Sequence, residues 1–223
     1  PECIEGDPSD TRFVIREHGI RYQIDFGAGY SQGLFLDQRD NRAEVGRRAA
    51  GLRVLNCFSY TCGFSVSAAV AGAESTTSID LSSGYLDWGK ENFALNGIDL
   101  ASAEHYFCRG DSFEWLAQFR RKRRSFGAVV LDPPTFSRSK RGGVFRVERD
   151  YARLTEAATR LLAKGGWLLA CCNHRALSAR QFRESVREGV LAAGGRISSL
   201  DMRPMPPDFR GEPYLKSAWV DLK

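Results

Sequence analysis

The feature that most constrains the fold is a regular alternation of strand-like and helix-like segments from Arg53 to the end of the chain. Strand-like segments recur at Arg53–Cys57, Ser75–Asp80, Glu104–Arg109, Phe126–Leu131 and Trp167–Cys172. Segments with helical spacing lie between them, near residues 64–72, 84–96, 112–123, 149–162 and 178–193. Such alternation predicts a parallel sheet with helices on both faces, a Rossmann-like α/β fold.

The two ends of this series complete the predicted architecture. Arg196–Met202 and Leu215–Leu222 are joined by a short loop, and a loop without a crossover helix cannot connect parallel neighbours. We therefore expect a seven-stranded, mostly parallel sheet with an antiparallel last strand. Ahead of it, alternating residues around His18-Gly19 predict a β-hairpin, followed by a short helix between Asp37 and Ala50. The chain thus divides into an N-terminal hairpin and helix (residues 1–50) and an α/β domain (residues 51–223).

Composition excludes several classes of protein. The longest strongly apolar run, Trp167–Cys172, is too short to cross a bilayer, and Pro1–Arg12 has no secretory pattern. The six cysteines include no C-x-x-C pair and the three histidines are scattered, so we expect neither a disulfide framework nor a metal site. A reducing, cytoplasmic location follows. The net charge of +5 is compatible with a polyanionic partner.

The first strand-to-helix loop indicates the kind of cofactor. Ligands of open α/β sheets bind beyond the carboxyl ends of the strands, and a dinucleotide pyrophosphate needs several closely spaced glycines there. Only Gly63 is present, so the loop suits a cofactor without phosphates, such as S-adenosylmethionine, although it could be an ordinary turn. At the next two strand ends, Asp80 can accept both ribose hydroxyls and Asp111 can accept the adenine amino group beside Phe113. Either carboxylate could instead cap the following helix.

The strongest local signal is the segment Asp132-Pro133-Pro134-Thr135-Phe136 at the end of the fourth strand. Two prolines fix the backbone as it leaves the strand, which would hold Asp132 and the carbonyl of Pro133 facing the methyl group. Phe136 would offer a flat face to a base rotated out of its stack. The candidate catalytic residues are therefore Asp132, Pro133, Pro134 and Phe136. The alternative is a rigid turn with a buried Phe.

Two basic clusters compete as an RNA-binding surface. Arg120–Arg124 follows the third helix of the series, so we expect it at the far edge of the sheet, as a solvated face beside a helix C-terminus. A second group follows the Asp-Pro-Pro segment and the fifth strand, where phosphate contacts would orient an RNA while the site reads its base. Its members are Arg138, Lys140, Arg141, Arg146, Arg149 and Arg175. We expect Gly142-Gly143 to make the loop between them mobile.

Several motifs together resemble a known family. Leu34–Arg39, Leu55–Gly63, Glu91–Gly97 and Asp132–Lys140 resemble segments of the bacterial large-subunit (23S) rRNA methyltransferases, which make 5-methylcytosine or 7-methylguanine. The match runs from about residue 12 to the end. It implies a class I methyltransferase fold, S-adenosylmethionine as cofactor and ribosomal RNA as partner. With the residues above, the candidate cofactor-binding set is Gln38, Arg39, Asn56, Phe58, Ser59, Tyr60, Thr61, Gly63, Asp80, Leu81, Asp111, Ser112 and Asp132.

The two branches of this family require different chemistry. Methylation of cytosine carbon 5 needs a Cys thiolate that adds to carbon 6, just beyond the fifth strand. Here Asn173 takes that place, and Cys172, one residue earlier, would point to the opposite face. Guanine nitrogen 7 has an exposed lone pair and needs only positioning. We favour guanine nitrogen 7. The alternatives are cytosine carbon 5 with Cys172 as nucleophile, a non-RNA substrate, a nucleotide-dependent oxidoreductase, and a fold without catalysis.

Overall fold

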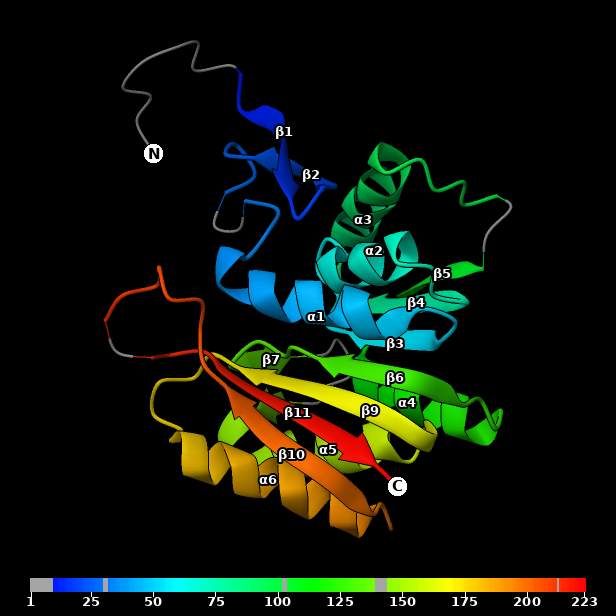
Figure 1. Ribbon diagram of the computed structural model, residues 1–223, viewed down its shortest axis with the longest axis vertical. Coiled ribbons are helices and arrows are strands. Elements are labelled where there is room, and N and C mark those ends of the chain that lie inside the picture. The colour runs from blue at the N-terminus through cyan, green and yellow to red at the C-terminus, as the bar shows by residue number, and fades with distance from the viewer. Residues whose placement is uncertain (1–9, 30–31, 102–103, 139–143, 212) are drawn as a thin grey trace.

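The computed structural model describes residues 10–29, 32–101, 104–138, 144–211 and 213–223. Its centre is a seven-stranded sheet in the order β10-β11-β9-β6-β3-β4-β5 (Figure 1). The strands are β3 (Arg53–Cys57), β4 (Ser75–Asp80), β5 (His105–Arg109), β6 (Phe126–Leu131), β9 (Leu162–Cys172), β10 (Ile197–Arg203) and β11 (Lys216–Leu222). β3, β4, β5, β6 and β9 pair in parallel, whereas β11 runs antiparallel to both β9 and β10. The predicted sheet with a reversed last strand is confirmed.

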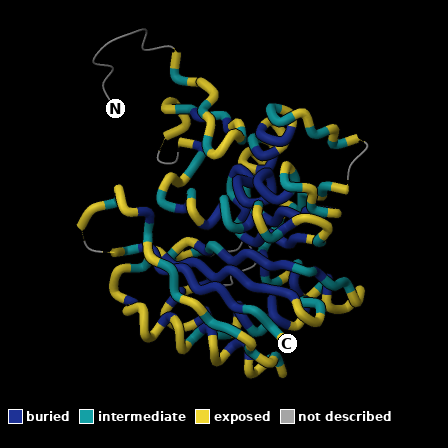
Figure 2. Tube along the Cα trace, in the orientation of Figure 1, coloured by how far each residue is buried: buried dark blue, intermediate teal, exposed yellow. Residues whose placement is uncertain are grey.

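Six helices cover this sheet in the described part of the chain, three on each face. They are α1 (Arg39–Ala49), α2 (Gly63–Val70), α3 (Ser83–Leu95), α4 (Ser112–Arg121), α5 (Val147–Thr159) and α6 (Ala179–Ala192). The first three lie above the sheet in Figure 1 and the last three lie below it. β3 shows how one strand serves both faces: Leu55 packs with α4–α6 residues such as Leu154, and Val54 packs with α1–α2 residues such as Ala68. Figure 2 accordingly shows burial concentrated in the central strands.

Local signals set the ends of these helices. Ser178 and Gln181 form a capping box at the start of α6, with the Ser178 Oγ accepting from the Gln181 N–H. Ser82 caps α3 in the same way, through the Tyr85 N–H. Gly51, at φ +70°, follows the last turn of α1 in a left-handed conformation that glycine adopts without strain.

The predicted hairpin is also present. β1 (Arg12–Glu17) pairs antiparallel with β2 (Ile20–Asp25), and His18 and Gly19 turn the chain with positive φ angles. The ring of Tyr22 in β2 is fully buried among residues of α2 and α3. The side chain of Asn92 accepts from the Gln23 N–H at 2.8 Å. The hairpin is therefore fixed against the helices on one face of the sheet.

Three details differ from the sequence-based expectation. β7 (Phe136–Arg138) and β8 (Val144–Arg146) form a small antiparallel ribbon where we expected a mobile loop. The expected Gly142-Gly143 hinge lies outside the described residues. β9 begins at Leu162, five residues before the apolar run, and a 3-10 turn, η1 (Leu36–Gln38), precedes α1.

Two kinds of feature are absent from the described residues. No helix among them has the length and apolar character needed to span a membrane. They also contain no group of three or more His, Cys, Asp or Glu side chains arranged to hold a metal ion.

Candidate active site

The loop between β3 and α2 has an unusual backbone. Phe58, Tyr60 and Cys62 have φ angles of +59°, +49° and +63°, in the left-handed region that non-glycine residues rarely occupy. Conformations of this kind cost roughly 1–3 kcal/mol each and occur mainly where a ligand is bound. The loop leads directly into α2, whose first N–H groups point toward the carboxyl edge of the sheet and favour an anionic group. The loop therefore suits the carboxylate of a methionine moiety at the N-terminus of α2.

The end of β4 holds this loop in place. The Ser59 N–H donates to the carbonyl of Ile79 at 2.8 Å, and the Tyr60 N–H donates to Asp80 Oδ2 at 2.9 Å. On the other side, the Tyr60 hydroxyl accepts from the Gly33 N–H at 2.8 Å. Because the loop is anchored on both sides, its strained residues keep one conformation.

Two glycines allow the loop to pack this closely. A Cβ on Gly63 would lie 3.1 Å from Leu34 Cδ1, and a Cβ on Gly89, inside α3, would lie 2.4 Å from the Sγ of Cys62. Gly63 was predicted as part of the site. Gly89 was missed, although a glycine in the middle of a helical pattern is a signal of close packing.

Asn56 is fully buried beneath the loop. Its Nδ2 donates to Ser65 Oγ at 3.0 Å, and Ser65 Oγ lies 2.7 Å from Ser78 Oγ. Its Oδ1 has no hydrogen-bond partner among the described residues. A buried acceptor without a partner is costly, and one at this position suits a donor such as an ammonium group or a ligand-bound water. Asn56 Oδ1 and the N-terminus of α2 together fit an amino-acid head group.

Asp80 lies at the tip of β4, beside the loop. Oδ2 accepts from Tyr60 and Oδ1 accepts from the Ser82 N–H at 2.9 Å, so each oxygen keeps a lone pair for a further donor. Burial raises the pKa of Asp80, and these backbone N–H groups oppose the rise. The N-cap of α3 is Ser82 and not Asp80, which removes the capping alternative for Asp80. Leu81, next in the chain, exposes its apolar side chain.

Asp111 does cap a helix, as the alternative interpretation proposed. Its Oδ1 accepts from the N–H groups of Phe113 at 2.9 Å and Glu114 at 3.2 Å, at the start of α4. Both bonds use the same oxygen, so the cap and a contact through Oδ2 are compatible. Ser112, another predicted cofactor contact, turns into the protein and is 3% exposed.

Asp132 lies at the tip of β6, on the other side of β3. Its Oδ2 accepts from Gln38 Nε2 at 3.0 Å. Burial raises the pKa of Asp132 to about 7, the nearby negative charge of Asp37 adds to the rise, and the Gln38 hydrogen bond opposes it. The carboxyl group therefore changes charge close to neutral pH.

A buried hydrogen-bond chain fixes Gln38 itself. Its Oε1 accepts from Asn41 Nδ2 at 2.6 Å, and the same amide nitrogen donates to Ser217 Oγ at 2.7 Å. Trp219 Nε1 donates to Asn41 Oδ1 at 3.1 Å. This chain runs from β11 through α1 to Asp132. Gln38 was predicted to lie near the cofactor, but nothing in the local sequence around Asn41, Ser217 or Trp219 revealed their connection, because it is made by the tertiary fold.

The segment after Asp132 is rigid and ends in an exposed ring. Pro133 is buried and Pro134 is exposed, and Thr135 Oγ1 donates to Asn173 Oδ1 at 3.2 Å. The Phe136 side chain is 50% exposed, with the Arg146 guanidinium 5.9 Å from the ring centroid. The alternative of a buried Phe at this position is excluded.

The predicted basic residues divide into three groups. Arg146 and Arg175 are exposed, and Arg175 lies 5.4 Å from the centroid of the Tyr214 ring. Arg149 donates to the Asp150 carboxylate and, at 2.9 Å, to the Val144 carbonyl, so it holds β8 on α5. Arg138 belongs to β7, but its side chain, Lys140 and Arg141 lie outside the described residues.

Two further predicted residues are placed clearly. Arg39 forms an ion pair with Asp208, which ties the loop between β10 and β11 to the start of α1. Cys172 is 0% exposed and packs in the core beneath α5 and α6, and burial raises its pKa. Asn173, one residue later, is exposed at the carboxyl edge. The opposite orientation expected for these two neighbours is therefore observed.

The three acidic residues gather at one edge of the sheet. Cys57, the last residue of β3, pairs with Ile79 of β4 on one side and Leu131 of β6 on the other. The Gly110 N–H donates to the carbonyl of Asp80 at 2.9 Å. With strands about 4.8 Å apart, Asp80 and Asp132 flank the loop after β3 and Asp111 follows on the next strand. This is where a ligand of an open α/β sheet binds.

Comparison with known proteins agrees with this geometry. A family model described as S-adenosylmethionine-dependent methyltransferase matches residues 1–213. The chain belongs to this family. The predictions of a methyltransferase fold and of S-adenosylmethionine as the cofactor are thereby confirmed for the family to which the chain belongs.

Individual relatives narrow the comparison. Ribosomal RNA large subunit methyltransferase K of Neisseria meningitidis serogroup B is 38% identical over 90% of this chain and 54% of the relative. Ribosomal RNA large subunit methyltransferase I of Aeromonas salmonicida is 36% identical over 92% of this chain and 51% of the relative. The crystal structure of SMU.776 complexed with SAH superposes with a TM-score of 0.90, at 33% identity, over 98% of this chain and 58% of that one. The chain therefore spans about half the length of these relatives.

Proposed function

We propose that this chain transfers a methyl group from S-adenosylmethionine to a base of large-subunit ribosomal RNA, with nitrogen 7 of guanine as the acceptor. The half-exposed ring of Phe136, four residues after Asp132 at the carboxyl edge of the sheet, carries this proposal. An enzyme that acts on a base taken out of its stack needs a flat apolar face beside polar edge contacts. The names of the Neisseria and Aeromonas relatives support ribosomal RNA as the source of the base.

The first part of the proposal concerns how the chain holds its cofactor. S-adenosylmethionine, when bound, supplies an electrophilic methyl group on a sulfonium. The N-terminus of α2 binds the carboxylate of the methionine part, and Asn56 Oδ1 accepts from its ammonium, directly or through a water. The free lone pairs of Asp80 accept from the ribose hydroxyls, and Leu81 covers the adenine ring. Asp111 and the backbone of Ser112 contact its edge.

The second part concerns the acceptor base. Guanine presents N–H donors on its Watson–Crick edge, and Asp132 and the carbonyl of Pro133 are acceptors at the tip of β6. Phe136 stacks on the ring, so nitrogen 7 is directed toward the methyl group. This nitrogen carries a lone pair and loses no proton before transfer, so the chain has to position the base and needs no nucleophile.

Methylation of cytosine carbon 5 is the second candidate, because Cys172 is the residue that could act as the nucleophile. Its thiol is buried in the core and faces away from the edge where Phe136 lies. Cys172→Ser should therefore leave methyl transfer within a few-fold. Complete loss of transfer by a correctly folded Cys172→Ser variant, or an RNA–protein adduct with the unmodified chain, would establish the cytosine reaction.

The direct experiment uses the purified chain with S-adenosylmethionine and unmodified large-subunit RNA, followed by nucleoside mass spectrometry. We expect 7-methylguanosine to appear in proportion to the enzyme. Appearance of 5-methylcytidine would instead select the second candidate. Methyl transfer only to non-RNA material would reject both candidates and support another substrate class.

Domain organisation and location complete the proposal. We propose that residues 1–50 form an appended hairpin and helix on a methyltransferase domain at residues 51–223. We also propose a cytoplasmic location, where ribosomal RNA is made in bacteria. The five cysteines among the described residues are all free and mostly buried, which suits a reducing compartment.

A further inference from the structure

A groove of about 580 Å³ separates α4 from α5, on the face of the sheet below the active edge. Its floor is apolar and is formed by Leu116 and Ala117 of α4 with Ala157 of α5. Four arginines line it, against one carboxylate, that of Glu156. They are Arg120, Arg121, Arg153 and Arg160. Two of them belong to the Arg120–Arg124 cluster that the sequence analysis interpreted as a solvated face.

The groove begins near the active edge. Phe113, two residues after Asp111, lines it, and the guanidinium of Arg153 lies 4.5 Å from the centroid of the Phe113 ring. On α5, Arg149 and Arg153 fall on one side with Arg160, the C-cap residue, because each residue advances by about 100°. This stripe begins just after Arg146, the N-cap residue beside Phe136, and spans roughly 16 Å along the helix axis at about 1.5 Å per residue.

Helix C-termini explain only some of these charges. Arg120 and Arg121 lie in the last turn of α4, where cations favour the helix dipole. Arg153 is in the middle of α5 and 64% of its side chain is exposed. Its nearest carboxylate, Asp150, is 3.9 Å away and already accepts shorter hydrogen bonds from Arg149. Arg153 therefore contacts only the Phe113 ring and the distant Asp150 carboxylate, so most of its charge is left for a ligand.

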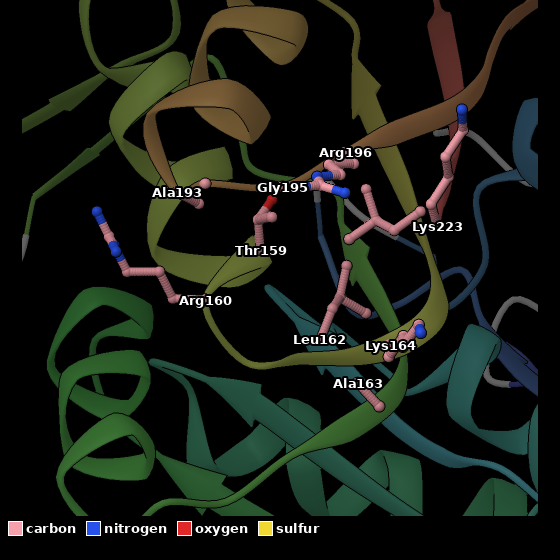
Figure 3. A pocket seen from close by; sticks show the side chains of 11 residues that line it. Thr159, Arg160, Leu162, Ala163, Lys164, Ala193, Gly195, Arg196 and Lys223 are labelled. Carbon is pink, nitrogen blue, oxygen red and sulfur yellow. The ribbon is translucent and has the colours of Figure 1, made fainter.

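At the far end of the groove, the charge of Arg160 is compensated. Arg160 is paired with Glu156 at 2.7 Å and donates to the Ala192 carbonyl at the end of α6 at 3.0 Å. Arg160 also borders a second hollow of about 420 Å³, shown in Figure 3, in which Lys164, Arg196 and Lys223 surround Leu162. Arg160 is therefore occupied by contacts within the fold, which leaves Arg120, Arg121 and Arg153 as the arginines of the groove that can bind a ligand.

We propose that the groove between α4 and α5 binds the sugar–phosphate backbone of an RNA strand that extends from the nucleotide held at Phe136. Arg120, Arg121 and Arg153 contact successive phosphates, because guanidinium groups bind phosphate oxygens with paired hydrogen bonds. The inference rests on the proposed function for the position of the target base. The excess of positive over negative charge in the groove favours a polyanion as its occupant.

The test measures the salt dependence of RNA binding. The 223-residue chain is titrated into a fluorescein-labelled single-stranded RNA of mixed sequence, by anisotropy, over about 50 to 200 mM KCl. Each lost phosphate contact lowers the slope of log K against log salt by about 0.7 for a single strand. We expect the triple variant Arg120→Ala/Arg121→Ala/Arg153→Ala to lower the slope by roughly 2 and to weaken binding at low salt more than at high salt.

Two matched variants separate contact from general charge. Arg180→Ala/Arg183→Ala/Arg187→Ala removes three exposed charges from α6, outside the groove, and should leave the slope close to that of the unmodified chain. Replacing the three groove arginines with lysine keeps the charges and should restore most of the slope. Equal slope losses for the α4–α5 and α6 alanine variants, or no loss in either, would overturn the proposal. The proposal would also be overturned if the triple alanine variant bound RNA as the unmodified chain does and lost only binding to another protein.

Methyl transfer is measured separately. A slope change without any RNA methylation would support the groove and contradict the proposed function. Methylation of RNA by a triple variant with an unchanged slope would contradict the groove alone. Thermal melting and S-adenosylmethionine titration of each variant should match the unmodified chain, since all the substituted side chains are exposed.

Discussion

The two halves of the sheet differ in their residue types and in their backbone conformations. The cofactor half (β3, β4 and β5 with α2 and α3) has a strand of sequence STTSID whose first four residues are all buried polar side chains. In the acceptor half (β6, β9 and β11), the central strand β6 is wholly apolar (FGAVVL), and the buried polar residues of β11 are Lys216 and Ser217. The cofactor half also contains the three left-handed residues Phe58, Tyr60 and Cys62, whereas prolines stiffen the acceptor tip.

This difference shows where the chain carries features that lower its folding stability and that suit ligand binding. Buried hydroxyl and amide groups and strained backbone are unfavourable for folding alone, and they concentrate at functional sites. Among the described residues, buried side-chain atoms without a hydrogen-bond partner occur in both halves, at Asn56 Oδ1 and Thr77 Oγ1 in the cofactor half and at Trp167 Nε1 in the acceptor half. The left-handed residues and the polar strand β4 are therefore what set the cofactor half apart. Substitutions in the cofactor half should therefore lower cofactor affinity, and substitutions in the acceptor half should lower methyl transfer.

The largest effect is expected in the acceptor half, for Asp132→Ala. Loss of this carboxylate removes the polar contact at the tip of β6, and misplacement of reacting groups by about 1 Å costs on the order of a hundredfold in rate. Methyl transfer, followed by isotope-labelled incorporation, should fall at least about a hundredfold. Affinity for S-adenosylmethionine, measured by calorimetry, should stay within a few-fold. A large loss of cofactor affinity would show that the two halves do not act separately.

The corresponding change in the cofactor half is Asp80→Ala. It removes acceptors for the ribose hydroxyls and for the N–H groups of Tyr60 and Ser82. Hydrogen bonds to charged groups contribute about 1.5–3 kcal/mol, so cofactor affinity should fall roughly tenfold to hundredfold. Asp87→Ala, an exposed change on α3, is the control and should have no effect. Unchanged affinity in Asp80→Ala would refute the placement of the ribose.

A third prediction uses the raised pKa of Asp132, which is about 7. A carboxyl group whose pKa is higher in the folded than in the unfolded state stabilises the folded chain at low pH. This contribution to the free energy of unfolding is lost as the pH rises from about 4 to about 7. Asp132→Asn removes this titration and retains an acceptor for Gln38. The unmodified chain should therefore lose roughly 2 kcal/mol relative to the variant between pH 5 and 8, as measured by urea unfolding. Parallel stability curves would contradict an elevated pKa.

The smallest effect is expected for Phe136→Ala. Stacking of a base on an aromatic side chain contributes about 1–3 kcal/mol, so the KM for RNA should rise roughly tenfold. Because half of the ring is exposed, thermal stability should change little. Phe136→Tyr keeps a flat ring and should retain the KM. If alanine and tyrosine behaved alike, Phe136 would not be the surface on which the base stacks.

Much of the architecture was predictable from local pattern. The bounds of β3, β4 and β6 agree residue by residue with the predicted strands: β3 and β6 are buried apolar segments, and β4 is rich in β-branched residues. The ribbon of β7 and β8 was missed, since two three-residue strands carry too little pattern. β9 was cut short because Lys164, Gly165 and Gly166 interrupt its apolar run.

The site was predictable only in part. Strand ends identified Asp80, Asp111 and Asp132, because the position of a carboxylate after a strand is a local property. The capping of α4 by Asp111 and the inward turn of Ser112 were not decided by sequence. The chain from Trp219 through Asn41 to Gln38 joins segments far apart in sequence, and no local pattern records such a connection. The exposure of Phe136 likewise depends on the packing of its surroundings.

The place of β11 in the chain has a consequence for how the protein matures. β11 follows every other element in sequence but is inserted between β9 and β10, and its Ser217 and Trp219 hold Asn41. During synthesis the loop between β3 and α2 can form early. Gln38 and Asp132 are held in place through Asn41 only after β11 enters the sheet. A nascent or truncated chain would then acquire ligand affinity before it acquires turnover.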